Sequence, residues 1–207
     1  MDTFDLYKDI QCRTNGEIYL GVVGPVRSGK STFIKRFMDV LVLPKMTDEH
    51  AKERTVDELP QSASGKSIMT TEPKFVPKEA AEIQLAKDVS VLVRLIDCVG
   101  YMVEGAAGHM ENGAERLVKT PWNEKEIPFT KAAEIGTKKV IHDHSTIGIV
   151  VTTDGSIGEL PRNSYRAAEK KTIQELKSIG KPFVVLVNTR KPYSAEAKNV
   201  AEEIQKE

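Results

Sequence analysis

An eight-residue segment near the start of the chain has the residue types that bind the phosphates of a nucleotide. It reads GPVRSGKS from Gly24 to Ser31 and fits the pattern G-x-x-x-x-G-K-[ST]. Glycines let backbone amides turn inward around a phosphate, Lys30 can reach the β- and γ-phosphates, and the Ser31 hydroxyl can bind Mg²⁺. We therefore predict a site for a nucleoside triphosphate that consists of Gly24, Pro25, Val26, Arg27, Ser28, Gly29, Lys30, Ser31 and Thr32.

A second segment, DCVG from Asp97 to Gly100, matches D-x-x-G and closes a predicted strand. At such a position the carboxylate of Asp97 holds Mg²⁺ through water, and the amide of Gly100 meets the γ-phosphate. An acid at the end of a strand can instead serve only as a turn former or a helix cap. Its place one predicted hairpin after the first motif favours the metal role. Asp97 is therefore predicted as a Mg²⁺ ligand and, together with Lys30, as a catalytic residue.

Two threonines, Thr70 and Thr71, stand just before that predicted hairpin. This is the place of the threonine that completes Mg²⁺ coordination and senses the γ-phosphate in nucleotide switches. The sequence does not choose between them, so both are predicted as metal-binding and catalytic candidates. The structural alternative for each is strand propensity, because threonine is common where strands begin.

The segment NTRK from Asn188 to Lys191 follows another predicted strand, where small GTPases carry N-K-x-D. Asn188 is retained and is predicted to contact the nucleotide. The acid that would accept two N–H donors of guanine is missing, and the loss of such hydrogen bonds can cost several decades of selectivity. The sequence therefore predicts ATP rather than GTP as the substrate.

Two further residues bear on how water would attack the nucleotide. Tyr101 directly follows D-x-x-G, where Ras-like proteins keep a glutamine that orients the water, so a self-contained GTPase switch is disfavoured. Arg27 lies inside the first motif, and a guanidinium there can stabilise transition-state charge as an arginine finger does. The alternative is that Arg27 points to solvent. The other candidates for placing the water are the two threonines, the segment 101–128 and a neighbouring subunit.

Strand and helix patterns alternate along the chain, which predicts an α/β fold with a mostly parallel sheet. Residues 45–74 are predicted to form a long loop with a short helix. Residues 101–128 are predicted to form a loop of a length that is usually functional or mobile. The predicted strands are 18–23, 81–86, 89–96, 146–153 and 183–187, and the predicted helices are 31–42, 129–143, 162–179 and one that starts at Ser194.

Composition narrows the class of protein. A chain of 207 residues suits a single domain. Lys plus Arg (30) equals Asp plus Glu (30), so no overall charge draws the chain onto nucleic acid, and no nucleic-acid partner is expected. Two cysteines without metal-ligand spacing argue against a disulfide framework or a zinc site. The N-terminus is acidic and no long apolar run occurs, which predicts a cytoplasmic protein without a signal peptide or membrane span.

With these motifs in place, the sequence resembles the stage IV sporulation protein A family of spore-forming bacteria through the whole chain. The resemblance implies a three-layer P-loop NTPase fold of the translation-factor GTPase type, with helices on both faces of the sheet. Since family members are considerably longer, residues 1–207 look like their N-terminal nucleotide-hydrolysing domain. The resemblance is carried by the blocks GEIYLGVVGPVRSGKSTFIKRFM, DELPQSASGKSIMTTEPKFVP, RLIDCVGY, NGAERLVKTPW, EIGTKKVI and HSTIGIVVTTDGSIG.

The resemblance also implies a function. Members of the family use ATP, with Mg²⁺, to assemble into a static polymer that forms the base layer of the spore coat on the mother-cell side of the outer forespore membrane. A small amphipathic membrane peptide holds the polymer there, and other coat proteins are recruited to it. In this sequence Lys30 matches the P-loop lysine, Asp97 the Walker B acid, and Thr70 or Thr71 the sensor threonine. Two alternatives stay open: a GTPase-like regulatory switch, and a scaffold that binds nucleotide with little turnover.

Overall fold

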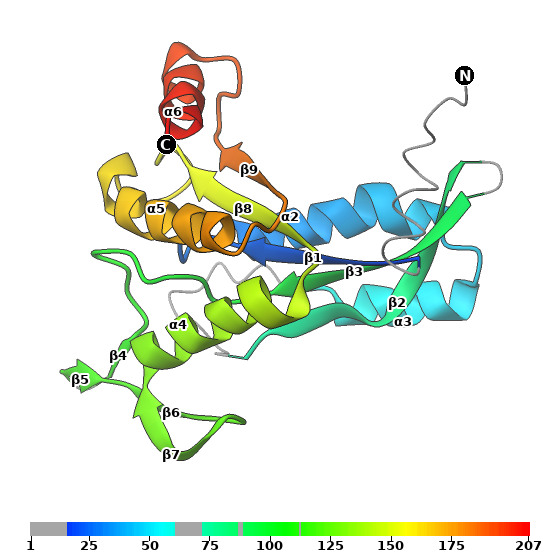
Figure 1. Ribbon diagram of the computed structural model, residues 1–207, viewed down its shortest axis with the longest axis horizontal. Coiled ribbons are helices and arrows are strands. Elements are labelled where there is room, and N and C mark those ends of the chain that lie inside the picture. Colours follow the sequence, from blue (N-terminus) through cyan, green and yellow to red (C-terminus); the bar gives the residue numbers. More distant parts are fainter. Residues whose placement is uncertain (1–15, 61–71, 87–88, 112) are drawn as a thin grey trace.

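The computed structural model describes residues 16–60, 72–86, 89–111 and 113–207. A five-stranded sheet with the order β2-β3-β1-β8-β9 runs through the middle of it (Figure 1). β3, β1, β8 and β9 are parallel, and β2 lies antiparallel to β3 at one edge. The prediction of an α/β chain with a mostly parallel sheet is thus confirmed. The strands are β1 (Glu17–Val23), β2 (Lys74–Ala86), β3 (Val89–Asp97), β8 (Ile147–Thr153) and β9 (Phe183–Asn188).

Helical segments cover both faces of this sheet. They are α2 (Lys30–Phe37), η1 (Met38–Val42), η2 (Leu43–Lys45), α3 (Glu49–Glu58), α4 (Phe129–Lys139), η3 (Val140–His144), α5 (Arg162–Ser178) and α6 (Ala195–Gln205). Neighbouring strand residues point to opposite faces, so Val22 packs with Ile34 of α2, while Val23 packs in a second cluster with Leu176 of α5 and Ile204 of α6. Figure 1 accordingly shows α2 on one side of the sheet and α4 and α5 on the other.

The first helix continues further than the sequence predicts. α2 begins directly after Gly29 and runs on into η1 and η2, past the predicted end at residue 42. Pro44 lies in the first turn of η2, where no backbone N–H donor is required. The helical path stops at Met46, whose backbone is extended. Pro44 is therefore part of the last helical turn.

The segment between the first helix and the first hairpin holds α3, the short helix expected there. The Asp48 carboxylate caps this helix by accepting hydrogen bonds from two amides of its first turn. The next strand, β2, starts at Lys74 and not at residue 81 as predicted. Its pairing with β3 is interrupted between Val76 and Ala81, and Pro77 lies in this irregular stretch. This irregular stretch interrupts the alternation of apolar and polar residues, so the first part of the strand was not predicted from the sequence.

The segment 101–128 contains two small hairpins. β4 (Met110–Glu111) pairs with β5 (Ala114–Glu115), and β6 (Leu117–Thr120) pairs with β7 (Asn123–Pro128). The prediction of a loop is therefore wrong for the strands between residues 110 and 128, while residues 101–109 lie outside every helix and strand. The strands are short and largely exposed, so they lack the alternation of apolar and polar residues by which a half-buried strand is predicted.

The remaining elements lie where the sequence predicts them. α4 with η3, β8, α5 and β9 fall on the predicted ranges, with ends that differ by a few residues. α6 begins after Ser194, whose side chain accepts a hydrogen bond from the amide of Ala197 at 3.2 Å. Over the ranges that the structure describes, every helix is too short or too polar to cross a lipid bilayer.

Candidate functional site

The glycine-rich segment 24–31 forms a tight loop between the carboxyl end of β1 and the first turn of α2. Gly24 has φ 128° and Gly29 has φ 95°, both in a region that favours glycine. A Cβ on Gly24 would lie 2.4 Å from the carbonyl oxygen of Val151 in the neighbouring strand. The loop is therefore pressed against the sheet at a position that only glycine tolerates. Its amides lead into the N-terminus of α2, where the helix dipole favours an anion.

Lys30, the first residue of α2, is buried inside this loop at 5% exposure. Its Nζ donates a hydrogen bond to the carbonyl oxygen of Pro25 at 2.6 Å and a longer one to that of Gly24 at 3.5 Å. Burial lowers the pKa of Lys30, and the nearby charge of Asp97 opposes that shift. The ammonium group is thus held at the centre of the predicted phosphate site by groups that a phosphate can replace.

Ser31 and Asp97 meet beside Lys30. The Ser31 hydroxyl donates to Oδ2 of Asp97 at 2.7 Å, while Oδ1 of Asp97 is buried without a hydrogen-bond partner. Burial raises the pKa of Asp97, and the hydrogen bond from Ser31 and the charge of Lys30 oppose it. An orphaned carboxylate oxygen next to a hydroxyl is the kind of oxygen ligand set that Mg²⁺ takes.

The ligand set fits the way Mg²⁺ binds with nucleotides. Mg²⁺ is usually held by one or two protein groups, with substrate phosphates and water completing its shell. Among the described residues no group of three or more His, Cys, Asp and Glu side chains stands ready to hold a metal by itself. Ser31 and Asp97 would therefore hold the ion only together with a bound triphosphate.

Gly100 brings the D-x-x-G segment onto the glycine-rich loop. Its φ is 92°, and a Cβ there would lie 2.1 Å from the carbonyl oxygen of Gly24 and 2.6 Å from Nζ of Lys30. Such contacts are far shorter than real Cβ contacts, so this position requires glycine. The structure thus brings the glycine-rich segment 24–31 and the segment 97–100 together at one site.

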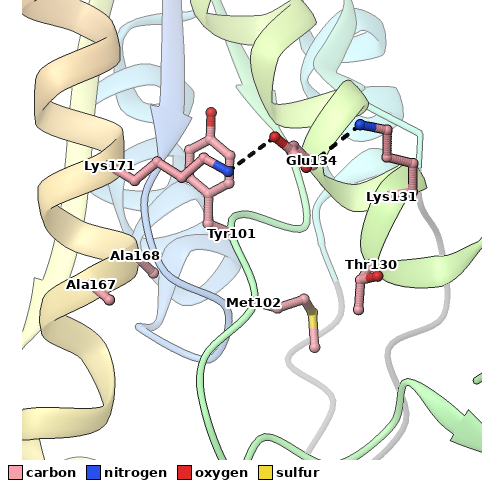
Figure 2. Close-up of a pocket in the computed structure, with 8 residues that line it drawn as sticks. All are labelled: Tyr101, Met102, Thr130, Lys131, Glu134, Ala167, Ala168 and Lys171. Atoms are coloured by element: carbon pink, nitrogen blue, oxygen red, sulfur yellow. Dashed lines mark hydrogen bonds and ion pairs between the residues drawn. The ribbon is translucent and has the colours of Figure 1, made fainter.

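Tyr101 contributes its backbone to the loop and its side chain to another place. Its amide donates to the carbonyl oxygen of Gly24 at 3.2 Å, and its carbonyl accepts from the amide of Val26 at 2.8 Å. Tyr101 is 3% exposed, and its ring lines a cavity of about 300 Å³ between α4 and α5, where Nζ of Lys171 lies 4.5 Å from the ring centroid (Figure 2). From the sequence, Tyr101 was notable only because it replaces the glutamine of Ras-like proteins. Its backbone hydrogen bonds to Gly24 and Val26 could not be predicted from the sequence.

Arg27 is exposed and has a left-handed backbone with φ 61°, which is uncommon for a residue other than glycine. Its Nη2 donates a hydrogen bond to the carbonyl oxygen of Ala107 at 3.1 Å. The side chain therefore ties the glycine-rich loop to the segment that follows Gly100. A role in stabilising transition-state charge stays a prediction.

Asn188, at the end of β9, braces the loop from the other side. Its Nδ2 donates to the carbonyl oxygen of Ser28 at 3.1 Å, and a Cβ on Gly29 would lie 2.3 Å from the same Nδ2. Asn188 thus lies against the predicted phosphate site, and its contact with a nucleotide stays a prediction. The following Thr189 donates to Oδ2 of Asp154, a residue that sequence reasoning did not single out. The sequence feature that could have pointed to Asp154 is its position directly after a buried strand, which is similar to the position of Asp97 at the end of β3.

The predicted site residues fall into three groups. Thr70 and Thr71 lie outside the described residues. Thr32 is exposed on α2, away from the buried part of the loop. The other predicted residues come together at the carboxyl ends of β1, β3 and β9, and they are Gly24, Pro25, Val26, Arg27, Ser28, Gly29, Lys30, Ser31, Asp97, Gly100 and Asn188.

Comparisons with known proteins give a consistent result. The family model described as Stage IV sporulation protein A, ATPase domain, matches residues 1–207. The protein named Stage IV sporulation protein A in Clostridioides difficile (strain 630) is 58% identical over 201 residues, covering 97% of this chain and 41% of that protein. Its namesake in Bacillus anthracis is 52% identical over 207 residues, covering 100% of this chain and 42% of that protein. The chain therefore spans less than half the length of these relatives.

Among solved structures, a crystal structure of an SsGBP mutation variant aligns with a TM-score of 0.43 and 17% sequence identity. The alignment covers 95% of this chain and 47% of that chain.

Proposed function

Since the chain belongs to the stage IV sporulation protein A family and matches its ATPase domain, we propose that it hydrolyses ATP to ADP and phosphate in a Mg²⁺-dependent reaction. The observation that carries this proposal is the pair formed by Ser31 and Asp97. The hydroxyl of Ser31 is hydrogen-bonded to one carboxylate oxygen, and the other oxygen is buried and unpaired beside Lys30. This arrangement supports a metal-triphosphate site better than a purely structural role.

Each group of the site has a role in this reaction. Ser31 and Asp97 would hold Mg²⁺, which when bound neutralises charge on the phosphates and orients them for in-line attack. Lys30 would exchange its hydrogen bonds to the carbonyls of Gly24 and Pro25 for contacts with phosphate oxygens. The negative charge of the phosphates would offset the free-energy cost of burying the ammonium group. The backbone of Gly100 approaches the loop closely enough for its amide to meet the terminal phosphate.

The fold in this proposal is a P-loop NTPase fold of the translation-factor GTPase type. The antiparallel edge strand β2 next to β3, together with D-x-x-G at the end of β3, supports this assignment. ATP is proposed over GTP because the segment 188–191 lacks an acid. The side chain of Tyr101 lines the cavity between α4 and α5, so the group that orients the attacking water lies elsewhere, with Arg27, Thr70 and Thr71 as candidates.

The biological role in this proposal is assembly. We propose that residues 1–207 form the ATPase domain of a longer protein, and that turnover drives self-assembly into the base layer of the spore coat. The polymer would lie on the outer forespore membrane, on the mother-cell side, with a small amphipathic membrane peptide and other coat proteins as partners. The relatives are named for a stage of sporulation, and the match to their ATPase domain supports a link between nucleotide turnover and that process.

Phosphate release from ATP and from GTP by the purified chain, with and without Mg²⁺, tests the reaction. We expect turnover of ATP that needs Mg²⁺ and that is lost in Lys30→Ala while the circular dichroism spectrum is kept. A clear preference for GTP would support a regulatory switch instead. Assembly by Lys30→Ala at the rate of the parent chain would point to a scaffold, because a scaffold needs no hydrolysis.

A further inference from the structure

The strand β9 lies at one end of the sheet, and its two faces are covered unequally (Figure 1). Phe183, Val185 and Val187 are partly buried against the cluster that includes side chains of α5 and α6. Val184 and Leu186, which alternate with them, are exposed. Successive residues of a strand point to opposite faces. The helices α5 and α6 therefore cover one face of β9, while the other face presents two large apolar side chains to solvent.

The exposure of this second face increases from the centre of the sheet toward β9. Val22 of β1, Ile149 of β8 and Val184 of β9 are aligned partners in neighbouring parallel strands, so they point to the same face. Their exposed fractions are 0%, 6% and 52%. In the next row Val151 is buried, and its partner Leu186 is 36% exposed. The helix α2 packs in the same cluster as the buried members of both rows, so its cover decreases toward β9.

The two edges of the sheet differ in sequence. Natural edge strands carry charged residues, proline or irregular pairing, which discourage the addition of a further strand. The edge strand β2 has all of these features, with Pro77, Lys78, Glu79 and Glu82 in and beside its irregular stretch. The helix α3 also holds this edge, because the amide of Lys78 donates to the Glu58 carboxylate at 2.7 Å.

The sequence of β9 has the opposite character. It reads FVVLVN and contains no charged residue and no proline. Continuous apolar runs are typical of parallel strands that lie inside a sheet and are buried on both faces. Within the ranges that the structure describes, β9 pairs only with β8. The residues of β9 thus indicate an interior strand, although its outer edge is unpaired in this part of the chain.

The connections between the parallel strands indicate where a further strand would lie. The helix α5 links β8 to β9, and it packs on one face of the sheet while β9 lies beyond β8. Such crossovers are right-handed in nearly all proteins. The helix α6 follows β9 and packs on the same face as α5, through Val200 and Ile204. A parallel strand that follows α6 would therefore lie beyond β9, at its outer edge.

The relatives have enough additional length to supply such a segment. The chain aligns with 42% and 41% of two of them, so more than half of each protein lies outside the aligned part. We propose that a segment following α6 in the longer protein adds a strand parallel to β9 and covers Val184 and Leu186 with apolar side chains. This inference goes beyond the proposed ATPase function and shares with it only the proposal that residues 1–207 belong to a longer protein.

Thiol labelling of the longer protein tests the cover over β9. Val184→Cys and Val56→Cys are matched variants, because the two valines are 52% and 49% exposed and Val56 lies on α3, away from β9. Each variant is labelled with a maleimide in the absence of nucleotide, and mass spectrometry of peptides follows the introduced thiol separately from Cys12 and Cys98. The rate for each thiol is divided by its rate in the urea-unfolded protein.

We expect the normalised rate at residue 184 to be at least about 10-fold lower than at residue 56, because a covered side chain reacts only after local opening. This ratio should stay the same when the protein is diluted about 100-fold, since a cover within one chain does not depend on concentration. Equal rates at the two residues overturn the proposal. A difference that disappears on dilution also overturns it and assigns the surface to a second copy of the chain.

Hydrogen exchange of the unsubstituted longer protein is a second measurement that needs no cysteine variant. In a strand, successive amides point to opposite edges, so a strand paired on one edge protects only alternate amides. We expect the amides of Val184, Val185, Leu186 and Val187 to be protected alike, and alternating fast and slow exchange would contradict the added strand. Neither measurement uses ATP, so a protein without ATPase activity would contradict the proposed function and leave this test unaffected.

Discussion

Two aspartates stand at the carboxyl ends of parallel strands, and they have opposite chemical surroundings. Asp97 ends β3 with one oxygen hydrogen-bonded to Ser31 and the other buried without a partner. Asp154 follows β8 with three hydrogen bonds from Ser156 and Thr189. Burial raises the pKa of Asp97, whereas hydrogen bonds outweigh burial and lower the pKa of Asp154. Asp97 therefore has a buried carboxylate oxygen that is free to bind a cation, as a catalytic metal ligand requires. Both carboxylate oxygens of Asp154 already accept hydrogen bonds within the fold.

The largest difference between the two aspartates should be in turnover. Asp97→Asn removes the negative charge that would hold Mg²⁺ beside Lys30, so we expect kcat for ATP to fall by at least about 100-fold. Asp154→Asn changes a carboxylate that is hydrogen-bonded to Ser156 and Thr189, and we expect kcat to fall by less than about 10-fold. Steady-state phosphate release at saturating Mg²⁺ measures both variants. Comparable losses of kcat in the two variants would contradict the assignment of the metal to Asp97.

A second prediction concerns the close approach of the Asp97 segment to the glycine-rich loop. Gly100→Ala would place a Cβ 2.1 Å from the carbonyl oxygen of Gly24, a backbone atom that cannot move freely. We expect turnover to fall more than about 10-fold and the Tm to drop by more than about 4 °C, since φ at Gly100 also disfavours alanine. Thermal unfolding followed by circular dichroism and phosphate release measure the two effects.

The matched control for this prediction is Gly180→Ala. Gly180 also has a positive φ, 64°, but a Cβ there meets nothing within 4 Å. Gly180→Ala should therefore lower the free energy of unfolding only through backbone strain, by about 1 kcal/mol, which corresponds to about 2–4 °C in Tm. Turnover should stay unchanged. If both variants lose the same Tm and keep their activity, the contact between Gly100 and Gly24 has no functional role.

The contrast between the two aspartates also shows what the sequence can reveal. The motifs at 24–31 and 97–100 are local patterns with fixed spacing, so the residues at Lys30, Ser31 and Asp97 could be assigned before the fold was known. The strong apolar periodicity of β1, β8 and α5 likewise predicted most of the sheet and its helices. These features depend on neighbours within a few residues, which is the range that a pattern records.

Contacts between distant segments were not predictable in this way. Asp154 is held by Thr189, thirty-five positions further along the chain, and no spacing rule connects them. The backbone hydrogen bond between Tyr101 and Val26 likewise joins segments that are far apart in the sequence. The hairpins between residues 110 and 128 escaped prediction for another reason, because exposed polar strands show no apolar alternation. Long-range hydrogen bonding and exposed strands are thus the parts that required the structure.

A third prediction uses the opposite pKa shifts. For Asp97 the folded-state pKa is raised, so its ionised form costs stability, and this cost disappears as the pH falls through the folded-state pKa. For Asp154 the folded-state pKa is lowered, so its ionised form contributes stability above the unfolded-state pKa, and this is lost as the pH falls through the folded-state pKa. At pH 7 Asp97→Asn should therefore raise the Tm and Asp154→Asn should lower it, each by about 2–4 °C.

Thermal unfolding of the parent chain and the two variants between pH 4 and pH 8 checks this prediction. The difference for Asp97→Asn should shrink as the pH falls toward about 4, where the ordinary carboxyl group of aspartate titrates. The difference for Asp154→Asn should persist down to about pH 4, because the folded-state pKa of Asp154 lies below the ordinary value. Changes of the same sign in both variants at pH 7 would show that the environments of Asp97 and Asp154 are alike, against the contrast drawn from their hydrogen bonds.

The smallest expected effect is at Tyr101, next to the Asp97 segment. Its backbone braces Gly24 and Val26, but its ring lies in the cavity between α4 and α5 beside Lys171. Tyr101→Phe keeps both the brace and the ring, so we expect kcat to change by less than about twofold. Tyr101→Gln installs the residue of Ras-like proteins, yet its side chain would start into the same cavity and so should not raise kcat. A tenfold loss in the first variant, or a gain in the second, would place the side chain of residue 101 in the reaction, and the water would then be positioned from the Asp97 side of the site after all.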